Sequence, residues 1–326
     1  MNSEQTELET LKEEYLVAGR RLSRVKSEAK RKELKEYVDD LKINLGWTLL
    51  DHAEYEQGLV LFESLSWRGY GETKYNGIAR ALIEMKHYDE AKKILEKGLK
   101  EFPESCALWT CLGNLNGRLG DHFESLICYE AAIRCDSEKD PGTLLNKALA
   151  LMGLGSHTDA LSIMDHLIEE YPKELLYLAE RGNCTLEIGY PREALQYCQK
   201  AMALYTESSD VHTGVCIYAG LCSAYIELRM KREAIVTALE GLKRFPDEDS
   251  VLYYNAGVAF SGMGWSEETL QILKKGVEKF PEDEDLKEFL KEVEGDMDDP
   301  DKGDNPSLLS LLLLMALIYK QKKKLN

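Results

Sequence analysis

Four regularly spaced histidines are the residues of this chain whose type and spacing first suggest a chemical role, the binding of a metal ion. His52, His87, His122 and His157 follow one another at intervals of 35 residues. Neutral imidazole is a common ligand of zinc and other transition metals. The donor atoms of a metal site converge to within about 2 Å of one ion. These histidines could therefore form a site only if the fold brought them to a single point.

The remaining polar groups form no recognisable catalytic pattern. The sequence contains no phosphate-binding loop, His-Glu-x-x-His, Gly-x-Ser-x-Gly or acidic calcium-loop motif. Carboxylates are plentiful, but none is paired with another in an apolar segment, as acid–base catalysis would require. We therefore expect no catalytic residues, no metal site and no cofactor, and a protein that is not an enzyme.

Charge and cysteine content restrict the partners and the compartment. The formal net charge of −17 argues against a nucleic-acid partner, because nucleic-acid binding uses clustered Lys and Arg. The 8 cysteines include no Cys-x-x-Cys pair, and the first residues show no basic region followed by an apolar run. We expect reduced thiols and a cytoplasmic location.

A repeated pattern predicts the elements that position these groups. Three segments carry Ala, then an apolar or small residue four positions later, then Pro eight positions after that: Ala91, Leu95 and Pro103; Ala160, Met164 and Pro172; Ala234, Ala238 and Pro246. This spacing describes one face of a helix followed by a helix-stopping residue. A period of about 34 residues predicts a stacked array of helix pairs rather than a single compact core.

Turn signals divide this array into repeats. Gly120, Gly155 and Gly189 each lie between two apolar-periodic segments, where glycine can end a helix in the left-handed conformation. We predict seven repeats between residues 39 and 283, at 39–71, 72–105, 106–140, 141–174, 175–214, 215–249 and 250–283. The fifth lacks the closing proline and carries about six extra residues, 209–214, which lengthen a turn or a helix end.

The residues within the repeats resemble the tetratricopeptide repeat (TPR) family. The motifs that carry this resemblance are Trp109-x-x-Leu112-Gly113, Tyr171-Pro172 and Ala256-Gly257-x-x-Phe260. A small residue recurs where the paired helices would cross, at Gly113, Ala148, Gly182, Cys222 and Gly257. The resemblance implies an all-α fold, a right-handed superhelical solenoid of helix-turn-helix repeats. Because helices pack about 10 Å apart, the four histidines are predicted to be separate turn residues.

The resemblance also implies a concave groove, lined by the first helix of each repeat, that accepts an extended peptide or a partner helix. The groove-facing positions are Asn44, Asn76, Arg80, Asn114, Arg118, Asn146, Asn183 and Asn255. Asn can donate to and accept from a peptide backbone, although the same residues also suit a solvated helix surface. One subtype of the family clamps a chaperone's terminal carboxylate with lysine. The matching positions here, Ile43, Trp47, Asn76 and Arg80, lack the lysine, so that function is not expected.

The flanking regions have their own composition. Residues 1–38 read as a charged helical arm, 284–294 as a polar-faced capping helix and 295–306 as an acidic linker. Residues 307–326 form an apolar segment with a basic end, whose apolar residues include Leu308, Leu311, Leu312, Leu314, Leu317 and Ile318. As a helix, residues 308–319 would span about 18 Å, against about 30 Å for a bilayer core. Membrane anchoring, docking on the chain's own scaffold and pairing with another chain all remain open.

These observations together predict a non-catalytic scaffold or adaptor. It would hold a peptide or helix of an unidentified protein partner in the groove. The more specific hypothesis is that the C-terminal apolar segment tethers the protein to a membrane surface, with the repeats facing the cytoplasm. The alternative is a soluble assembly or accessory subunit whose apolar tail docks on its own groove or dimerises.

Overall fold

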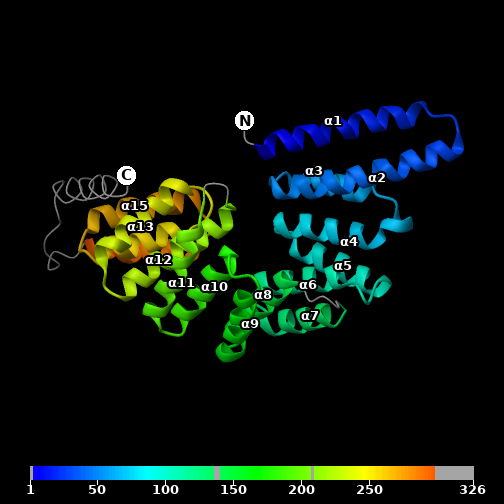
Figure 1. The fold of residues 1–326 in the computed structure, drawn as a ribbon. Helices are drawn as coiled ribbons and strands as arrows, with labels where there is room; N and C mark the ends of the chain where they lie inside the picture. The colour runs from blue at the N-terminus through cyan, green and yellow to red at the C-terminus, as the bar shows by residue number, and fades with distance from the viewer. Residues whose placement is uncertain (1–2, 136–139, 207–208, 298–326) are drawn as a thin grey trace. The chain divides into compact units, whose positions relative to one another are not determined.

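The structure is a computed structural model that describes residues 3–135, 140–206 and 209–297. The apolar segment 307–326, and the acidic linker beyond residue 297, lie outside the described residues. Within them every regular element is an α-helix (Figure 1). The chain divides into two compact units, Met1–Ala160 and Leu161–Asn326, and helix α9 (His157–Glu170) contains the division. The predicted all-α class is confirmed.

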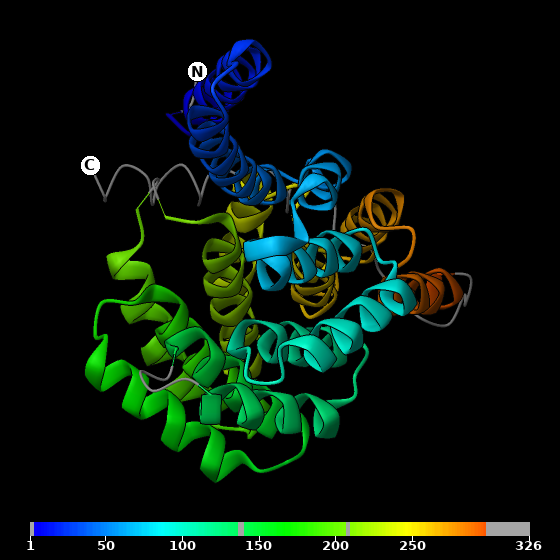
Figure 2. The same ribbon diagram turned by 90° about the vertical axis from the view of Figure 1, so that its right-hand side faces the viewer.

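The first unit is a series of antiparallel helices that pack in chain order. Its helices are α1 (Ser3–Arg24), α2 (Glu28–Asp51), α3 (Tyr55–Ser64), α4 (Trp67–Glu84), α5 (Tyr88–Glu101), α6 (Cys106–Arg118), α7 (His122–Cys135) and α8 (Pro141–Gly153). Besides neighbours in sequence, α2 contacts α4, α4 contacts α6 and α6 contacts α8. Both views show these helices, coloured blue to green, side by side (Figures 1 and 2). The first helices of successive pairs thus form one continuous layer.

The second unit repeats this arrangement. Its helices are α10 (Leu175–Glu187), α11 (Pro191–Leu204), α12 (Val211–Glu227), α13 (Lys231–Arg244), α14 (Val251–Ser261), α15 (Ser266–Lys279) and α16 (Glu284–Met297). Helix α12 contacts both α10 and α14, and α16 packs on α15. Leu286 of α16 is fully buried in the core that α12 to α15 share. The terminal helix therefore covers the last apolar face of this core.

Every helix pair from α2–α3 to α14–α15 turns through a residue in the left-handed conformation, two positions before the second helix. The three glycines predicted for this role have φ of 76° (Gly120), 76° (Gly155) and 83° (Gly189). Gly264 is similar. Ala53, Lys86 and Arg229 take the same conformation with φ of 59°, 61° and 57°. The turn geometry is therefore kept even where the sequence does not supply glycine.

The small residues predicted at the helix crossings do lie where backbones approach closely. A Cβ on Gly113 would lie 2.5 Å from the Tyr129 ring, and one on Gly182 would lie 2.5 Å from Cys198 Sγ. One on Gly257 would lie 2.8 Å from Leu273. Such separations are below van der Waals contact, so a larger residue would force the two helices of the pair apart.

Some boundaries set from the sequence fall inside helices. The predicted arm ends at residue 38, but α2 starts at Glu28 and no Pro or Gly interrupts it before Gly46. Helix α1 packs on α2 through Ala18 against Val38 and Leu41, so residues 28–38 continue the first helix of the first pair. Likewise α4 begins before residue 72, and α16 extends past residue 294 into the predicted linker.

The extra residues 209–214 lengthen a helix. Helix α12 has 17 residues, whereas α6, α8 and α10 have 13 each. The additional turn is at its N-terminal end, where the Asp210 carboxylate accepts a 2.8 Å hydrogen bond from the backbone N–H of Thr213. This cap satisfies one of the free N–H groups of the first turn and fixes where the longer helix begins.

Candidate functional site

A cavity with a mainly apolar lining and a few polar side chains lies among the first helices of the first unit. It has a volume of about 320 Å³, and its walls come mainly from α4, α6 and the start of α8. Three residues predicted for the groove, Asn76, Arg80 and Asn114, line it together. Thr110, Cys111 and Thr143 complete much of the remaining wall. The sequence period places these residues on neighbouring helices, and the direct packing of α4 on α6 brings them together.

The second helix of a pair holds the Asn114 amide in place. Asn114 Oδ1 accepts hydrogen bonds from the Tyr129 hydroxyl of α7 at 2.8 Å and from Asn146 Nδ2 of α8 at 3.0 Å. Tyr129 can reach this point because Gly113 leaves room for its ring. Burial raises the pKa of Tyr129 to about 12, so its hydroxyl remains a donor at neutral pH. The amide of Asn114 is therefore oriented before any ligand arrives.

Two amide groups of the cavity retain unused hydrogen-bonding capacity. Asn76 Oδ1 is buried and accepts no hydrogen bond from any described residue. Both bonds of Asn114 go to its oxygen, so its NH₂ group has no protein partner among the described residues. A buried acceptor without a partner costs free energy comparable to a lost hydrogen bond. The cavity thus offers a ligand the NH₂ group of the exposed Asn114, and Asn76 Oδ1 becomes an acceptor once its side chain turns toward the cavity.

The two predicted arginines have different surroundings. Arg118 Nη2 lies 2.6 Å from Glu84 Oε1, so its charge is compensated within the protein. Arg80 is exposed and lies over the Trp47 ring, 5.0 Å from its centroid. It forms no ion pair with any described residue, and a cation–π contact leaves guanidinium N–H groups free to donate. Arg80 is therefore the available cation of this cavity.

The polar groups where α6 meets the start of α8 form hydrogen bonds with one another. Asp140 caps α8 by accepting from the N–H and the hydroxyl of Thr143, at 2.7 Å and 2.8 Å. The Thr143 hydroxyl also lies 3.1 Å from that of Thr110. Burial raises the pKa of the Cys111 thiol to about 12, opposite to the shift that activates a nucleophilic cysteine. These residues shape the cavity rather than offering a reactive group.

The other groove predictions have separate locations. Asn44 is exposed on α2, while Asn183 and Asn255 belong to the second unit. Asn183 packs against α12, because a Cβ on Gly220 would lie 2.3 Å from its Oδ1. Asn255 is buried, and its NH₂ group donates to Ala219 O at 3.3 Å and Ser223 Oγ at 3.1 Å. Asn255 therefore ties α14 to α12 and is not exposed in a groove.

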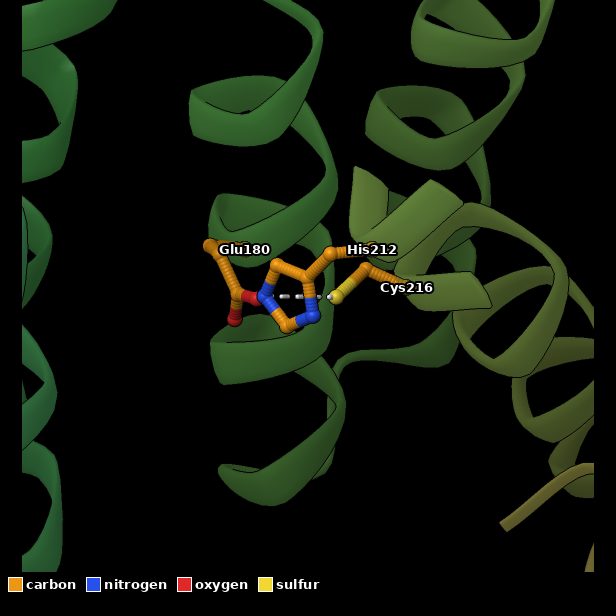
Figure 3. A group of neighbouring side chains, drawn as sticks. All are labelled: Glu180, His212 and Cys216. Carbon is orange, nitrogen blue, oxygen red and sulfur yellow. Dashed lines mark hydrogen bonds between the residues drawn. The ribbon is translucent and has the colours of Figure 1, made fainter. Parts of the chain in front are cut away.

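The spaced histidines lie at helix ends, as expected of turn residues. They are the C-cap of α2, the N-cap of α5 and the first residues of α7 and α9. A different group, Glu180, His212 and Cys216, converges in the second unit (Figure 3). Sequence reasoning did not find it, although His212 and Cys216 have the four-residue spacing that aligns side chains on a helix. Burial, followed by the Glu180 carboxylate, raises the pKa of the Cys216 thiol.

The described residues form helices of 10 to 24 residues. No helix among them combines the length and the apolar character that a bilayer crossing requires. The apolar residues named above, from Leu308 to Ile318, lie outside the described part of the chain.

Comparison with known proteins identifies the repeats. The tetratricopeptide repeat family profile matches residues 75–105 and, in a second form, residues 143–174. A sequence search of curated proteins finds no match. Each matched segment covers most of one helix pair, α4–α5 for the first and α8–α9 for the second.

Several solved structures share the fold. In the Cut9–Hcn1 hetero-tetramer of the APC/C, a chain 16% identical aligns with 83% of this chain and 57% of its own length, with a TM-score of 0.60. Yeast Tom70 is 12% identical over 90% of this chain and 61% of its own, with a TM-score of 0.59. A tetratricopeptide repeat protein from Parabacteroides merdae is 16% identical over 78% and 98%, with a TM-score of 0.57. The chain thus spans about three fifths of the two larger proteins, and at these identities the likeness concerns the fold alone.

Proposed function

The chain is a tetratricopeptide repeat protein, and on that basis we propose that it is a non-catalytic scaffold that holds an extended segment of a partner protein against α2, α4, α6 and α8. The observation that carries the proposal is that two amide groups of the first-unit cavity, Asn76 Oδ1 and the NH₂ group of Asn114, have no hydrogen-bond partner among the described residues. A partner can supply the hydrogen bond that the buried Asn76 Oδ1 lacks, because buried polar groups are normally satisfied, and it can replace water at the NH₂ group of the exposed Asn114.

An extended peptide has the chemistry that this cavity lacks. Each residue of a peptide backbone offers one N–H donor and one C=O acceptor. Asn76 Oδ1 would accept from a backbone N–H, and the Asn114 NH₂ group would donate to a backbone C=O. Recognition through the backbone tolerates many side chains, so this pair supports affinity rather than strict sequence preference.

Arg80 gives the site a preference for certain peptide side chains, which the two amides do not provide. It is an exposed arginine without an ion pair among the described residues, in a chain whose net charge is −17. A guanidinium binds a carboxylate through two parallel N–H···O bonds. We infer that the preferred peptide carries an Asp or Glu side chain that meets Arg80. A nucleic-acid partner is disfavoured by the same net charge.

A displayed library of random peptides tests this proposal even while the partner is unidentified. Peptides selected on the full chain would be measured by fluorescence anisotropy against wild type, Asn76→Ala and Asn114→Ala. Each substitution should weaken binding about tenfold, which corresponds to about 1.4 kcal/mol. Lys93→Ala on the exposed face of α5 is the control and should leave affinity unchanged. Equal affinity of all four proteins would contradict the proposal.

We further propose that residues 307–326 attach this scaffold to the cytoplasmic face of a membrane. The support is the composition of the segment, a twelve-residue stretch at 308–319 that is apolar except for Ser310, followed by lysines at 320 and 322–324. Lysine side chains can reach the headgroups of a bilayer that thins around a short span. Membrane fractionation with an alkaline carbonate wash tests this: retention in the pellet is expected.

Release into the supernatant would contradict the tether. It would favour the alternative, a soluble assembly or accessory subunit whose tail docks on its own groove or pairs with a second copy. A chain ending at residue 302 separates these two outcomes. Loss of thermal stability would indicate docking, and a lower oligomeric state in solution would indicate pairing.

A further inference from the structure

We propose that Glu180, His212 and Cys216 form a zinc-binding site that joins α10 to α12. One ligand atom from each of the three side chains lies within 4.8 Å of the other two. Figure 3 shows the carboxylate, imidazole and thiol turned toward a common point between the two helices. The site belongs to the second unit and does not depend on peptide binding in the first.

The spacing of the donors suits a tetrahedral ion. His212 Nε2 lies 3.7 Å from Cys216 Sγ. In zinc sites the Zn–N and Zn–S distances are about 2.0 and 2.3 Å, so two such donors on a tetrahedron are about 3.6 Å apart. An ion could therefore enter between the ring and the thiol with side-chain adjustments of less than an ångström. The carboxylate, within 4.8 Å, needs a larger rotamer adjustment to complete the set.

The fold supplies the site through the lengthened helix. His212 lies in the extra N-terminal turn of α12, which the Asp210 cap begins. Cys216 follows one helical turn later, so both side chains project from the same face. That face is directed to α10, which packs on α12 and carries Glu180. The additional residues 209–214 include His212, so a repeat of regular length would lack this ligand.

The ligand types select the ion. Imidazole nitrogen with thiolate sulfur suits zinc and disfavours magnesium and calcium, which take oxygen ligands. On binding, the thiol releases one proton to solvent, the neutral imidazole donates its lone pair, and the carboxylate binds as the anion. Three protein ligands leave the fourth position to water. His212 is exposed, so the ion has a direct route from solvent.

A bound ion would have a mechanical consequence. Glu180 lies on α10 and the other two ligands lie on α12, so one ion would cross-link the first helices of two successive helix pairs where the repeat is irregular. A ligand that binds only the folded state stabilises it by mass action. Zinc should therefore raise the melting temperature of the protein, and a chelator should reverse the rise.

Zinc titration of the full-length chain tests the site. Competition with a chromophoric chelator should give about one tightly bound Zn²⁺ per chain, and each of Glu180→Gln, His212→Ala and Cys216→Ser should weaken binding at least about tenfold. Co²⁺ is the second probe. A thiolate-to-cobalt charge-transfer band should form on the wild type and be absent from Cys216→Ser, whereas a site made of oxygen and nitrogen alone gives no such band.

Two matched variants distinguish this site from adventitious binding. His166 and Glu170 also lie four residues apart on one helix, with Nε2 and Oε1 separated by 3.7 Å, but no third ligand joins them among the described residues. Cys135 is an exposed free thiol elsewhere in the chain. His166→Ala and Cys135→Ser should keep wild-type affinity and the cobalt band. Loss of binding in either control, or unchanged binding when any of the three ligands is replaced in a folded protein, would overturn the proposal.

Discussion

The Tyr129 hydroxyl donates a 2.8 Å hydrogen bond to Asn114 Oδ1, and so a residue of α7 orients an amide on α6. The contact links two features of the repeat. The tyrosine fits because Gly113 has no side chain, and the amide it holds faces the cavity of the first unit. The position that permits close helix packing therefore also prepares the proposed peptide site.

Removing this hydroxyl should weaken peptide binding more than it weakens the fold. Tyr129→Phe keeps the ring packing and removes one neutral hydrogen bond, so we expect about 1 kcal/mol less stability. Asn114 would then be held by Asn146 alone, and the affinity for a selected peptide should fall several-fold. Urea denaturation and fluorescence anisotropy measure the two effects. Unchanged affinity in the variant would show that orientation of this amide is irrelevant to binding.

Glycines of the same helical array should respond to substitution in opposite directions. Gly182→Leu must displace Cys198 and the Ala194 carbonyl, so it should destabilise the protein by about 1–3 kcal/mol. Gly19→Ala, in α1 with no atom within 4 Å of the added Cβ, should stabilise by about 0.5–1 kcal/mol because alanine favours the helix. Thermal melts of both variants check the signs, and a Gly182→Leu protein as stable as wild type would refute the assigned helix crossing.

The left-handed turn at Arg229 predicts a stabilising substitution. Arg229 is exposed and has a φ of 57°, a conformation that costs an ordinary residue about 1 kcal/mol and glycine almost nothing. Arg229→Gly should therefore raise the midpoint of urea unfolding. Gly189→Ala, at the equivalent turn of the preceding pair, should lower it by a similar amount. The reverse order of the two midpoints would mean that the turns are not strained as described.

Buried thiols predict a loss of stability at alkaline pH. Burial raises the pKa of Cys222 from 9.0 to about 12, so the folded protein keeps a proton that the unfolded chain loses. The stabilising effect is complete below about pH 9 and is lost as pH rises toward 12. At about pH 10 this thiol should account for about 1 kcal/mol of lost stability.

Cys222→Ala isolates this contribution from other titrating groups. The variant loses packing at every pH, but its stability deficit relative to wild type should narrow by about 1 kcal/mol between about pH 8 and pH 10. Urea unfolding at the two pH values measures the difference. A deficit that stays constant would show that the thiol ionises equally in both states.

The sequence predicts the helix pairs well because each pair has local signals. Pro103, Pro172 and Pro246 stop helices, and Gly120, Gly155 and Gly189 mark turns whose conformation glycine favours. Non-local packing is harder to predict. Asn255 matches the groove register, yet its amide is used in tying α14 to α12. The start of α2 was also missed, because only packing on α1 shows that residues 28–38 continue that helix.

The candidate sites show the same limit. Register alone places Asn76, Arg80 and Asn114 on the first helices of neighbouring repeats, and they do line one cavity. Tyr129 lies on a second helix and enters the site only through the space beside Gly113. Glu180 is distant from Cys216 in sequence, and the packing of α10 on α12 brings it to the thiol.

The most direct test of the central claim is the side-chain amide NMR spectrum of the asparagines during titration with the tightest selected peptide. We expect the NH₂ signals of Asn76 and Asn114 to shift with the binding isotherm. The signal of Asn255, whose NH₂ group already donates to Ala219 and Ser223, should stay in place. Shifts confined to other asparagines, with Asn76 and Asn114 unmoved at saturation, would contradict the central claim.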